Sequence, residues 1–182
     1  MPSRPLTVEE IMAILSDTPG RLAAIVGEVE ESLLHAPPTD GEWSANDVLA
    51  HLRACSDVLG GNMLRIVAED QPSWRAMNPR TWQGKSGYHD WQFAPALAAF
   101  VAQRRELLEV LRSLPSEAWE RTATVAVPPN RTFEYSVRYY GDWLAGHERA
   151  HLKKLPGIIS AAAAANHVRP PTDARGEAHA SR

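Results

Sequence analysis

Cysteine is nearly absent from this chain, since Cys55 is the only one among its 182 residues. A single thiol excludes a disulfide within the chain and favours a reducing compartment. Long hydrophobic runs are also missing: no stretch of about 18 uncharged apolar residues occurs, which excludes a transmembrane helix. The first ten residues lack the basic and then apolar pattern of a secretory signal. We therefore expect a cytoplasmic protein with no membrane partner.

Neither sign of charge dominates the sequence. Its 19 basic and 22 acidic residues leave a net charge of -3, which offers no electrostatic footprint for a nucleic acid. An apolar fraction of 44% is ordinary for a folded domain, and the length suits one domain with its own core. We expect this domain to occupy residues 1–158. Residues 159–182 are alanine-rich and then polar, and we expect them to be largely disordered, with at most a short helix through the alanines.

Apolar residues recur at helical spacing through most of the expected domain. Ser44 and Asp47 fit a capping box at the start of one of the helices. Pro156 and Gly157 predict the end of the last one. The pattern predicts a short helix over residues 7–16 and four longer helices over about 19–35, 44–68, 93–114 and 132–155.

Strand signals are few, because residues 122–127 are β-prone but too isolated to predict a sheet. Residues 70–89 form a long connection, and connections of this length are uncommon unless they serve a function or lack order. The aromatic residues Trp74, Trp82 and Tyr88 either wall a cavity or simply pin this loop to the helices. Four long helices predict an all-α protein, a four-helix bundle with a long loop between its second and third helices.

Three histidines stand out on the predicted helices. His147 and His151 are four residues apart, so both rings project from one face of the last helix. They continue its apolar stripe, which directs them toward the bundle interior. His51 lies on the apolar face of another helix. A lone buried histidine usually binds nothing, but three on inward faces favour a divalent metal with three protein ligands and an open position.

The segment from His147 to His151 also matches the H-E-x-x-H pattern of zinc peptidases, in which the glutamate is the general base. Glu148 is rotated by roughly 100° around the helix from its neighbour, so a solvated surface charge is the competing interpretation. A peptidase would need a downstream glutamate ligand, which only Glu177 in the expected tail offers, and an edge strand for its substrate. We keep Glu148 as a candidate catalytic residue and a metallopeptidase as the least favoured function.

Four further residues have both a functional and an ordinary interpretation. Arg104, inside the apolar stripe of the third helix, either binds a substrate carboxylate or extends to the rim. Tyr140 either lines a substrate pocket or packs in the core. Asp47 either hydrogen-bonds the ring of His51 or only caps its helix. Cys55 either approaches the metal or fills the core.

Two blocks of the sequence resemble the DinB-like family of helical-bundle proteins. The first covers residues 42–52, with the sequence EWSANDVLAHL, and the second is the pair His147 and His151. Residues 100–105 are also similar to the third helix of that family. The resemblance covers about residues 7–156. It implies a four-helix bundle whose three-histidine metal site would consist of His51, His147 and His151.

The resemblance also implies a chemistry. Family members with an assigned role include thiol-dependent transferases and a thiol-dependent isomerase, the usual metals are zinc and nickel, and homodimers are common. It therefore implies a metal-dependent enzyme that activates a thiol or water against a small-molecule electrophile, with a low-molecular-weight thiol as cosubstrate. The alternative is a non-catalytic metal-binding or stress-response bundle, which a closed site with a fourth protein ligand would favour.

Overall fold

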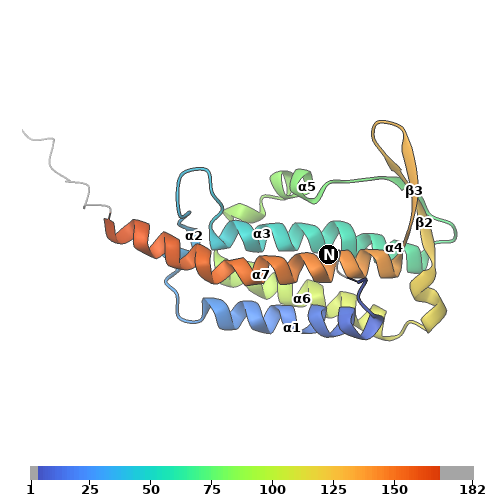
Figure 1. Ribbon diagram of the computed structural model, residues 1–182, viewed down its shortest axis with the longest axis horizontal. Coiled ribbons are helices and arrows are strands. Elements are labelled where there is room, and N and C mark those ends of the chain that lie inside the picture. The colour runs from blue at the N-terminus through green and yellow to red at the C-terminus, as the bar shows by residue number, and fades with distance from the viewer. Residues whose placement is uncertain (1–3, 169–182) are drawn as a thin grey trace, which may run out of the picture.

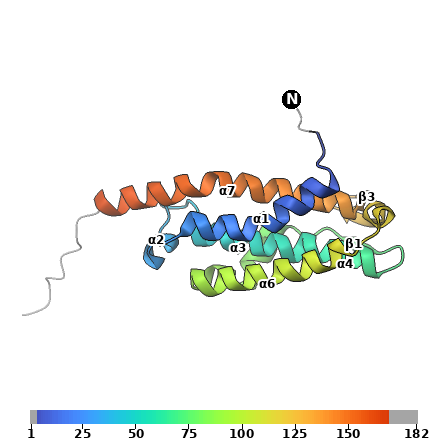
Figure 2. The ribbon, with the colours of Figure 1, turned by 90° about the horizontal axis from the view of Figure 1, so that it is seen from below.

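In the computed structural model, which describes residues 4–168, four long helical segments lie side by side (Figure 1). Both α6 and α7 contact α1 and α3, so the segments enclose one interior, as a turned view also shows (Figure 2). The expected four-helix bundle is confirmed. Its segments are α1 (Val8–Val26), α3 (Ala45–Cys55) continued through the π-helical turn η1 (Ser56–Gly60) into α4 (Gly61–Ala68), α6 (Phe93–Arg112) and α7 (Val137–Val168).

Two of these helices begin with the same local arrangement. The Thr7 hydroxyl accepts a hydrogen bond from the backbone N–H of Glu10, whose carboxylate accepts one from the backbone N–H of Thr7. Ser44 and Asp47 form an equivalent capping box at the start of α3, with distances of 3.1 and 3.0 Å. Each box satisfies two N–H groups, one at the cap and one in the first turn. The predicted start of the second bundle helix is confirmed.

A single continuous helix forms α1, so the predicted break between residues 16 and 19 was wrong. Pro19 lies inside this helix and has no N–H to donate to the carbonyl of Leu15, four residues before. That carbonyl accepts a hydrogen bond of 3.3 Å from the Arg104 guanidinium of α6 instead. Leu15 and Leu22 are both fully buried. Tertiary contacts therefore keep together a helix that its local sequence would interrupt.

The last helix continues beyond Pro156 to Val168, so its predicted end was also wrong. Ile158 and Ile159 pack against a buried cluster contributed by α1 and its neighbours, and the alanine run that follows has the highest helix propensity. The first ten residues of the expected disordered tail are therefore helical. The remainder of that tail, residues 169–182, lies outside the described part of the chain.

A small sheet lies at one end of the bundle, where no sheet was predicted (Figure 1). The central strand β2 pairs in parallel with β1 and antiparallel with β3. Ala123 and Val125 of β2 are buried, while Thr122, Thr124 and Ala126, which alternate with them, are exposed. A β-prone segment needs such partners for stability, and here they come from the expected loop and from the expected start of the last helix. The strands are β1 (Ser73–Arg75), β2 (Thr122–Val127) and β3 (Arg131–Ser136).

The long connection between the second and third bundle helices is itself structured. After β1 it forms α5, which lies beside α3 (Figure 1). The Asn78 side chain caps α5 by accepting a hydrogen bond of 2.9 Å from the backbone N–H of Arg80. The short elements that complete the described chain are α2 (Glu31–His35), α5 (Pro79–Ser86), η2 (Tyr88–Asp90) and η3 (Ser116–Glu120).

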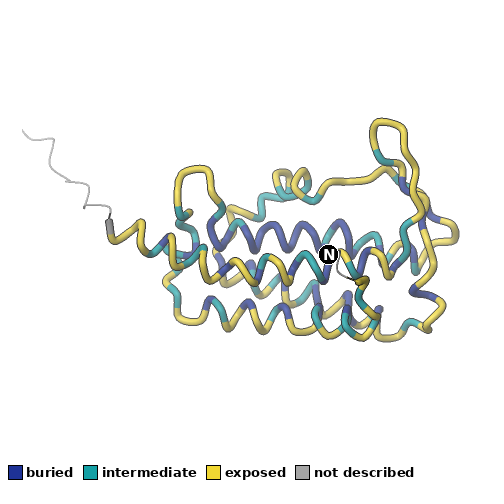
Figure 3. The backbone as a smooth tube through the Cα atoms, in the orientation of Figure 1, coloured by how far each residue is buried: buried dark blue, intermediate teal, exposed yellow. Residues whose placement is uncertain are grey.

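The buried apolar residues form two clusters along the bundle, and the buried positions recur along the helices (Figure 3). One cluster includes Ile11 and Met63 near the sheet, and the other includes Leu49 and Phe100 toward the far end. Each fully buried side chain of this kind contributes about 1.5–3 kcal/mol to stability. Buried polar groups from α3, η1, α6 and α7 interrupt the apolar core: His51, Ser56, Arg104 and Glu148. Along the described residues, no helix is both long and apolar enough to cross a bilayer.

Candidate metal centre

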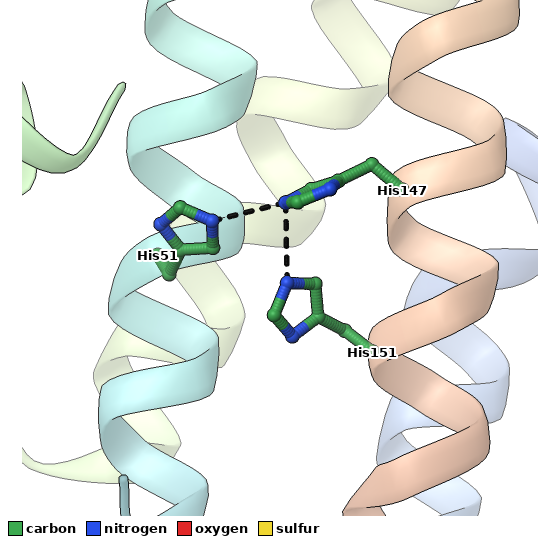
Figure 4. Close-up of side chains that lie close together, drawn as sticks. All are labelled: His51, His147 and His151. Carbon is green, nitrogen blue, oxygen red and sulfur yellow. Dashed lines mark hydrogen bonds between the residues drawn. The ribbon is translucent and has the colours of Figure 1, made fainter. Parts of the chain in front are cut away.

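The three histidines meet between α3 and α7 (Figure 4). Nε2 of His147 lies 3.0 Å from Nε2 of His51 and 3.1 Å from Nε2 of His151. The ligand atoms of all three rings lie within 4.8 Å of one another. The three histidines predicted from the sequence therefore lie together. The prediction used the four-residue spacing on α7 and the inward face of α3.

This spacing fits a metal ion. Tetrahedral ligands that each lie about 2.0–2.1 Å from zinc are roughly 3.3 Å apart from one another, close to the two Nε2 distances of 3.0 and 3.1 Å. Neutral imidazole suits zinc and nickel among the common biological metals. The ligand atoms of His51 and His151 lie within the 4.8 Å that spans the whole set.

Gln83 of α5 determines which nitrogen of His51 is free. The Gln83 amide nitrogen donates to the backbone carbonyl of Asp47 at 3.2 Å, which leaves its oxygen 3.1 Å from Nδ1 of His51. That oxygen accepts only from a protonated Nδ1, so Nε2 of the neutral ring carries a lone pair toward the other two histidines. Such a partner orients a ligand ring and makes it more basic.

Burial keeps the histidines neutral. It lowers the pKa of His147 to about 4, with smaller contributions from the positive charges of His51 and Arg80. Burial, followed by the charges of the neighbouring histidines, lowers the pKa of His151 to about 4, and burial also lowers the pKa of His51. A metal binds only the unprotonated ring, so the site is in its binding form at neutral pH.

An open pocket of about 720 Å³ adjoins the three rings. This volume lies within the range of small-molecule sites. Trp43 packs against His51 with 4.9 Å between ring centroids, and Trp143 stacks on His147 at 4.5 Å. Besides the histidines, the pocket is lined by Ala76, Met77, Asn78, Pro79, Arg80, Val127, Pro128 and Trp143.

Cys55 lies on the opposite, buried side of the site. Its Sγ is 3.5 Å from Nε2 of His51, and burial raises the pKa of the thiol to about 12. A thiol must lose its proton to bind a metal or to attack. Within the described residues, the cluster of candidate ligands comprises the three histidines without Cys55. This geometry matches a three-ligand, open site better than a closed structural one.

Glu148 and Arg104 form a buried ion pair with each other. Nη1 of Arg104 donates to Oε2 of Glu148 at 2.9 Å, Nη2 donates to Oε1, and Nη2 also donates to the Ser56 hydroxyl at 2.8 Å. The exposed fraction of Glu148 is 0% and that of Arg104 is 1%. The interpretation of Glu148 as a solvated charge was wrong. Neither residue lines the pocket beside the histidines, so the geometry offers no free carboxylate oxygen for a general base and no free guanidinium for a substrate.

For Tyr140 and Asp47 the sequence left a functional and an ordinary interpretation open. Tyr140 lines a smaller cavity of about 170 Å³ beside Tyr135 and Tyr139, not the pocket over the histidines. The Asp47 carboxylate caps α3, and its contribution to the site passes through its backbone carbonyl, which holds Gln83. The ordinary interpretation of both side chains is the one that the contacts support.

The sequence interpretation missed three residues that contact or face the site. Trp143 precedes His147 by four residues and was detectable from helical spacing alone. Gln83 and Arg80 belong to a connection without a recognised helix, and no local signal placed them beside α3. The aromatic residues of that connection pin it to the bundle, since Trp82 and Tyr88 donate to the Asp57 carboxylate at 2.7 and 2.8 Å.

Comparisons with known proteins agree with this architecture. The model of the DinB superfamily matches residues 14–155. Among solved structures, the chain is similar to YfiT from Bacillus subtilis, described as a probable metal-dependent hydrolase with an unusual four-helix bundle topology. The TM-score is 0.66 at 18% sequence identity, over 88% of this chain and 93% of that one, which establishes a shared fold. No curated protein matches the chain.

Proposed function

Because the chain belongs to the DinB superfamily, we propose that it is a metal-dependent enzyme whose divalent cation is held by His51, His147 and His151. When bound by three neutral ligands, such a cation retains its full charge and lowers the pKa of a coordinated water or thiol. The convergence of three Nε2 atoms beside an open pocket carries the proposal. The reaction is nucleophilic attack of water or a thiol on a small electrophile.

The side chains around the three histidines each have a defined role in this proposal. Gln83 keeps Nε2 of His51 unprotonated, and burial keeps the two histidines of α7 neutral, so that each ring has one nitrogen without a proton. Trp43 and Trp143 fix the planes of the rings by packing on them. The remaining side of the site faces the pocket, where the electrophile binds within reach of the nucleophile.

Several finer features belong to the proposal as well. Zinc or nickel is the proposed metal, because both accept imidazole ligands. A low-molecular-weight thiol is the proposed cosubstrate where the reaction is a transfer, and water replaces it where the reaction is a hydrolysis. A homodimer in the cytoplasm is the proposed setting.

Elemental analysis of the purified protein tests the metal site first. We expect about one zinc or nickel per chain in the wild type and loss of the metal in His51→Ala, His147→Ala and His151→Ala. His89→Ala is the matched control, because this half-exposed histidine contacts Asp90 and not the site. Full metal content in any of the three variants would contradict the ligand assignment.

A second measurement separates the two reactions. The metal-loaded protein is assayed with 4-nitrophenyl acetate for hydrolysis and with 1-chloro-2,4-dinitrobenzene plus a thiol for transfer. A rate that depends on the metal, and that the three histidine variants lose, supports an enzyme. Stoichiometric metal without either activity, across a wider panel of electrophiles, would favour the non-catalytic metal-binding alternative.

A further inference from the structure

Arg80 is placed beside the histidines by α5. Its guanidinium carbon lies 5.1 Å from the centre of the Trp43 ring, and Trp43 in turn packs against His51 at 4.9 Å and His151 at 6.2 Å. Arg80 also lines the same pocket as the three histidines. After the larger effect of burial, its positive charge contributes to lowering the pKa of each of them. The positive charge of Arg80 therefore lies at the edge of the site.

No acidic side chain balances this cation. The pocket lining includes no aspartate or glutamate. Among the ion pairs of the described residues, none involves Arg80, and its guanidinium makes no hydrogen bond there. A cation bound by the histidines would add to the positive charge. The electrostatic complement of this pocket is therefore an anion.

The rest of the pocket wall is apolar. Met77 is 54% exposed and Trp143 is 40% exposed, and both face the pocket together with Val127 and Pro128. Large apolar side chains that are exposed around a cavity are typical of ligand-binding surfaces. The cavity beside Tyr139 shares Met77, Val127 and Trp143 with this pocket and extends the apolar wall. A ligand with an aromatic or aliphatic body fits such a wall.

We propose that the substrate is an amphiphilic organic acid whose carboxylate pairs with Arg80 while its apolar body lies against Met77, Val127 and Trp143. This inference rests on the proposed function, because it places the reacting centre of that acid over the three histidines. A guanidinium binds a carboxylate through two parallel hydrogen bonds, which fixes both the position and the orientation of the molecule.

A carboxylate fits better than a phosphate. Phosphate sites commonly add the free N–H groups of a helix N-terminus to their basic side chains. At the N-terminus of α5, the N–H of Arg80 already donates to Asn78. Arg80 is the only basic side chain in the pocket lining, and a single guanidinium matches a single carboxylate.

Binding of a matched pair of probes tests the proposal by calorimetry. The probes are 4-phenylbutyrate and its neutral analogue 4-phenylbutanamide, titrated into zinc-loaded and metal-free full-length protein. We expect the acid to bind at least about tenfold tighter than the amide, the effect of one charge-assisted hydrogen bond. Arg80→Gln should abolish this preference and Arg80→Lys should retain part of it. Arg105→Gln, which removes an exposed arginine of α6 paired with Glu109, should leave the preference unchanged.

The metal-free titrations identify the group that binds the carboxylate. A preference that persists without zinc and disappears in Arg80→Gln supports the proposal. A preference that requires zinc and survives in Arg80→Gln would overturn it, since the carboxylate would then bind the metal. Equal affinity for acid and amide in the wild type would overturn it too. A protein that takes up no metal, yet retains the Arg80-dependent preference, would refute the proposed function and not this inference.

Discussion

At the scale of single residues, Arg104 and Glu148 join all four helical segments of the bundle through one buried group of charges. Arg104 of α6 binds the Glu148 carboxylate of α7, the Ser56 hydroxyl of η1 and the carbonyl of Leu15 that Pro19 leaves free. Desolvating two charges costs more than their attraction usually returns, unless nearly every polar atom has a partner. Since Nε of Arg104 has no partner among the described residues, we expect the pair to contribute more to the alignment of the helices than to stability.

Glu148→Leu should destabilise the metal-free protein by about 3–5 kcal/mol, because it leaves Arg104 buried without a counter-charge. The double variant Glu148→Leu/Arg104→Met should recover most of that loss, since apolar residues of similar volume replace the pair. Urea unfolding measures both free energies. A loss below about 1 kcal/mol in the single variant would show that the charge reaches solvent. Wild-type turnover in the double variant would exclude Glu148 as the general base.

At the scale of elements, the segment that carries α5 adds side chains to a site whose histidines belong to the bundle helices α3 and α7. It supplies Gln83 to His51 and Arg80 to the pocket. Its position depends on Asp57 of η1, whose carboxylate accepts hydrogen bonds from Trp82 and Tyr88 of this segment. Gln103 of α6 donates to the same carboxylate. One acidic residue of the π-helical turn thus positions two side chains of the candidate site.

Asp57→Ala should loosen this segment without unfolding the bundle. We expect limited proteolysis between residues 73 and 91 to become at least about tenfold faster, as anchored loops become accessible when local opening costs less free energy. Zinc affinity should fall by about tenfold through the loss of Gln83 from His51. Asp90→Ala is the control, because the carboxylate of Asp90 is exposed and pairs with His89, not with a residue of the site. Unchanged proteolysis in Asp57→Ala would refute the anchoring role.

Arg53 reinforces the same attachment through aromatic contacts. Its guanidinium carbon lies 3.8 Å from the centre of the Tyr88 ring and 4.3 Å from that of Trp91. Contacts of this kind contribute about 0.5–2 kcal/mol each. The segment between the second and third bundle helices is therefore held by side chains of α3 and η1 at several points.

At the scale of the whole molecule, the histidines make stability depend on pH. The pKa of His147 and that of His151 are about 4 in the folded chain and about 6.5 in an unfolded chain. Between these values the unfolded chain binds more protons, so the free energy of unfolding rises with pH. The contribution is complete above about pH 6.5 and is lost progressively as the pH falls toward 4.

Urea midpoints of the metal-free protein at several pH values between 7 and 5 measure this slope. We expect the midpoint to fall over that interval in the wild type. His147→Gln and His151→Gln should each show a shallower fall, because one group that titrates on unfolding is gone. A control variant, His89→Gln, should keep the wild-type slope. A flat wild-type profile would mean that the buried rings titrate normally in the folded state.

The sequence alone determined the features that depend on local periodicity. Apolar residues at helical spacing predicted the bundle, the Ser44 capping box predicted the start of α3, and the spacing of His147 and His151 placed both rings on one face. Each of these signals acts within one or two helical turns. They sufficed for the fold class and for the three histidines of the candidate metal centre.

Tertiary structure decided everything that depends on partners distant in the sequence. Arg104 supplies the hydrogen bond that α1 lacks at Pro19, and packing against the bundle carries α7 past Pro156. The sheet formed because β2 found partners on both edges. Glu148 is buried because Arg104, 44 residues away, neutralises it, and Gln83 reaches His51 across 32 residues. No local pattern encodes such pairs, because the free energy of their interaction is gained only once the folded chain brings the two groups together.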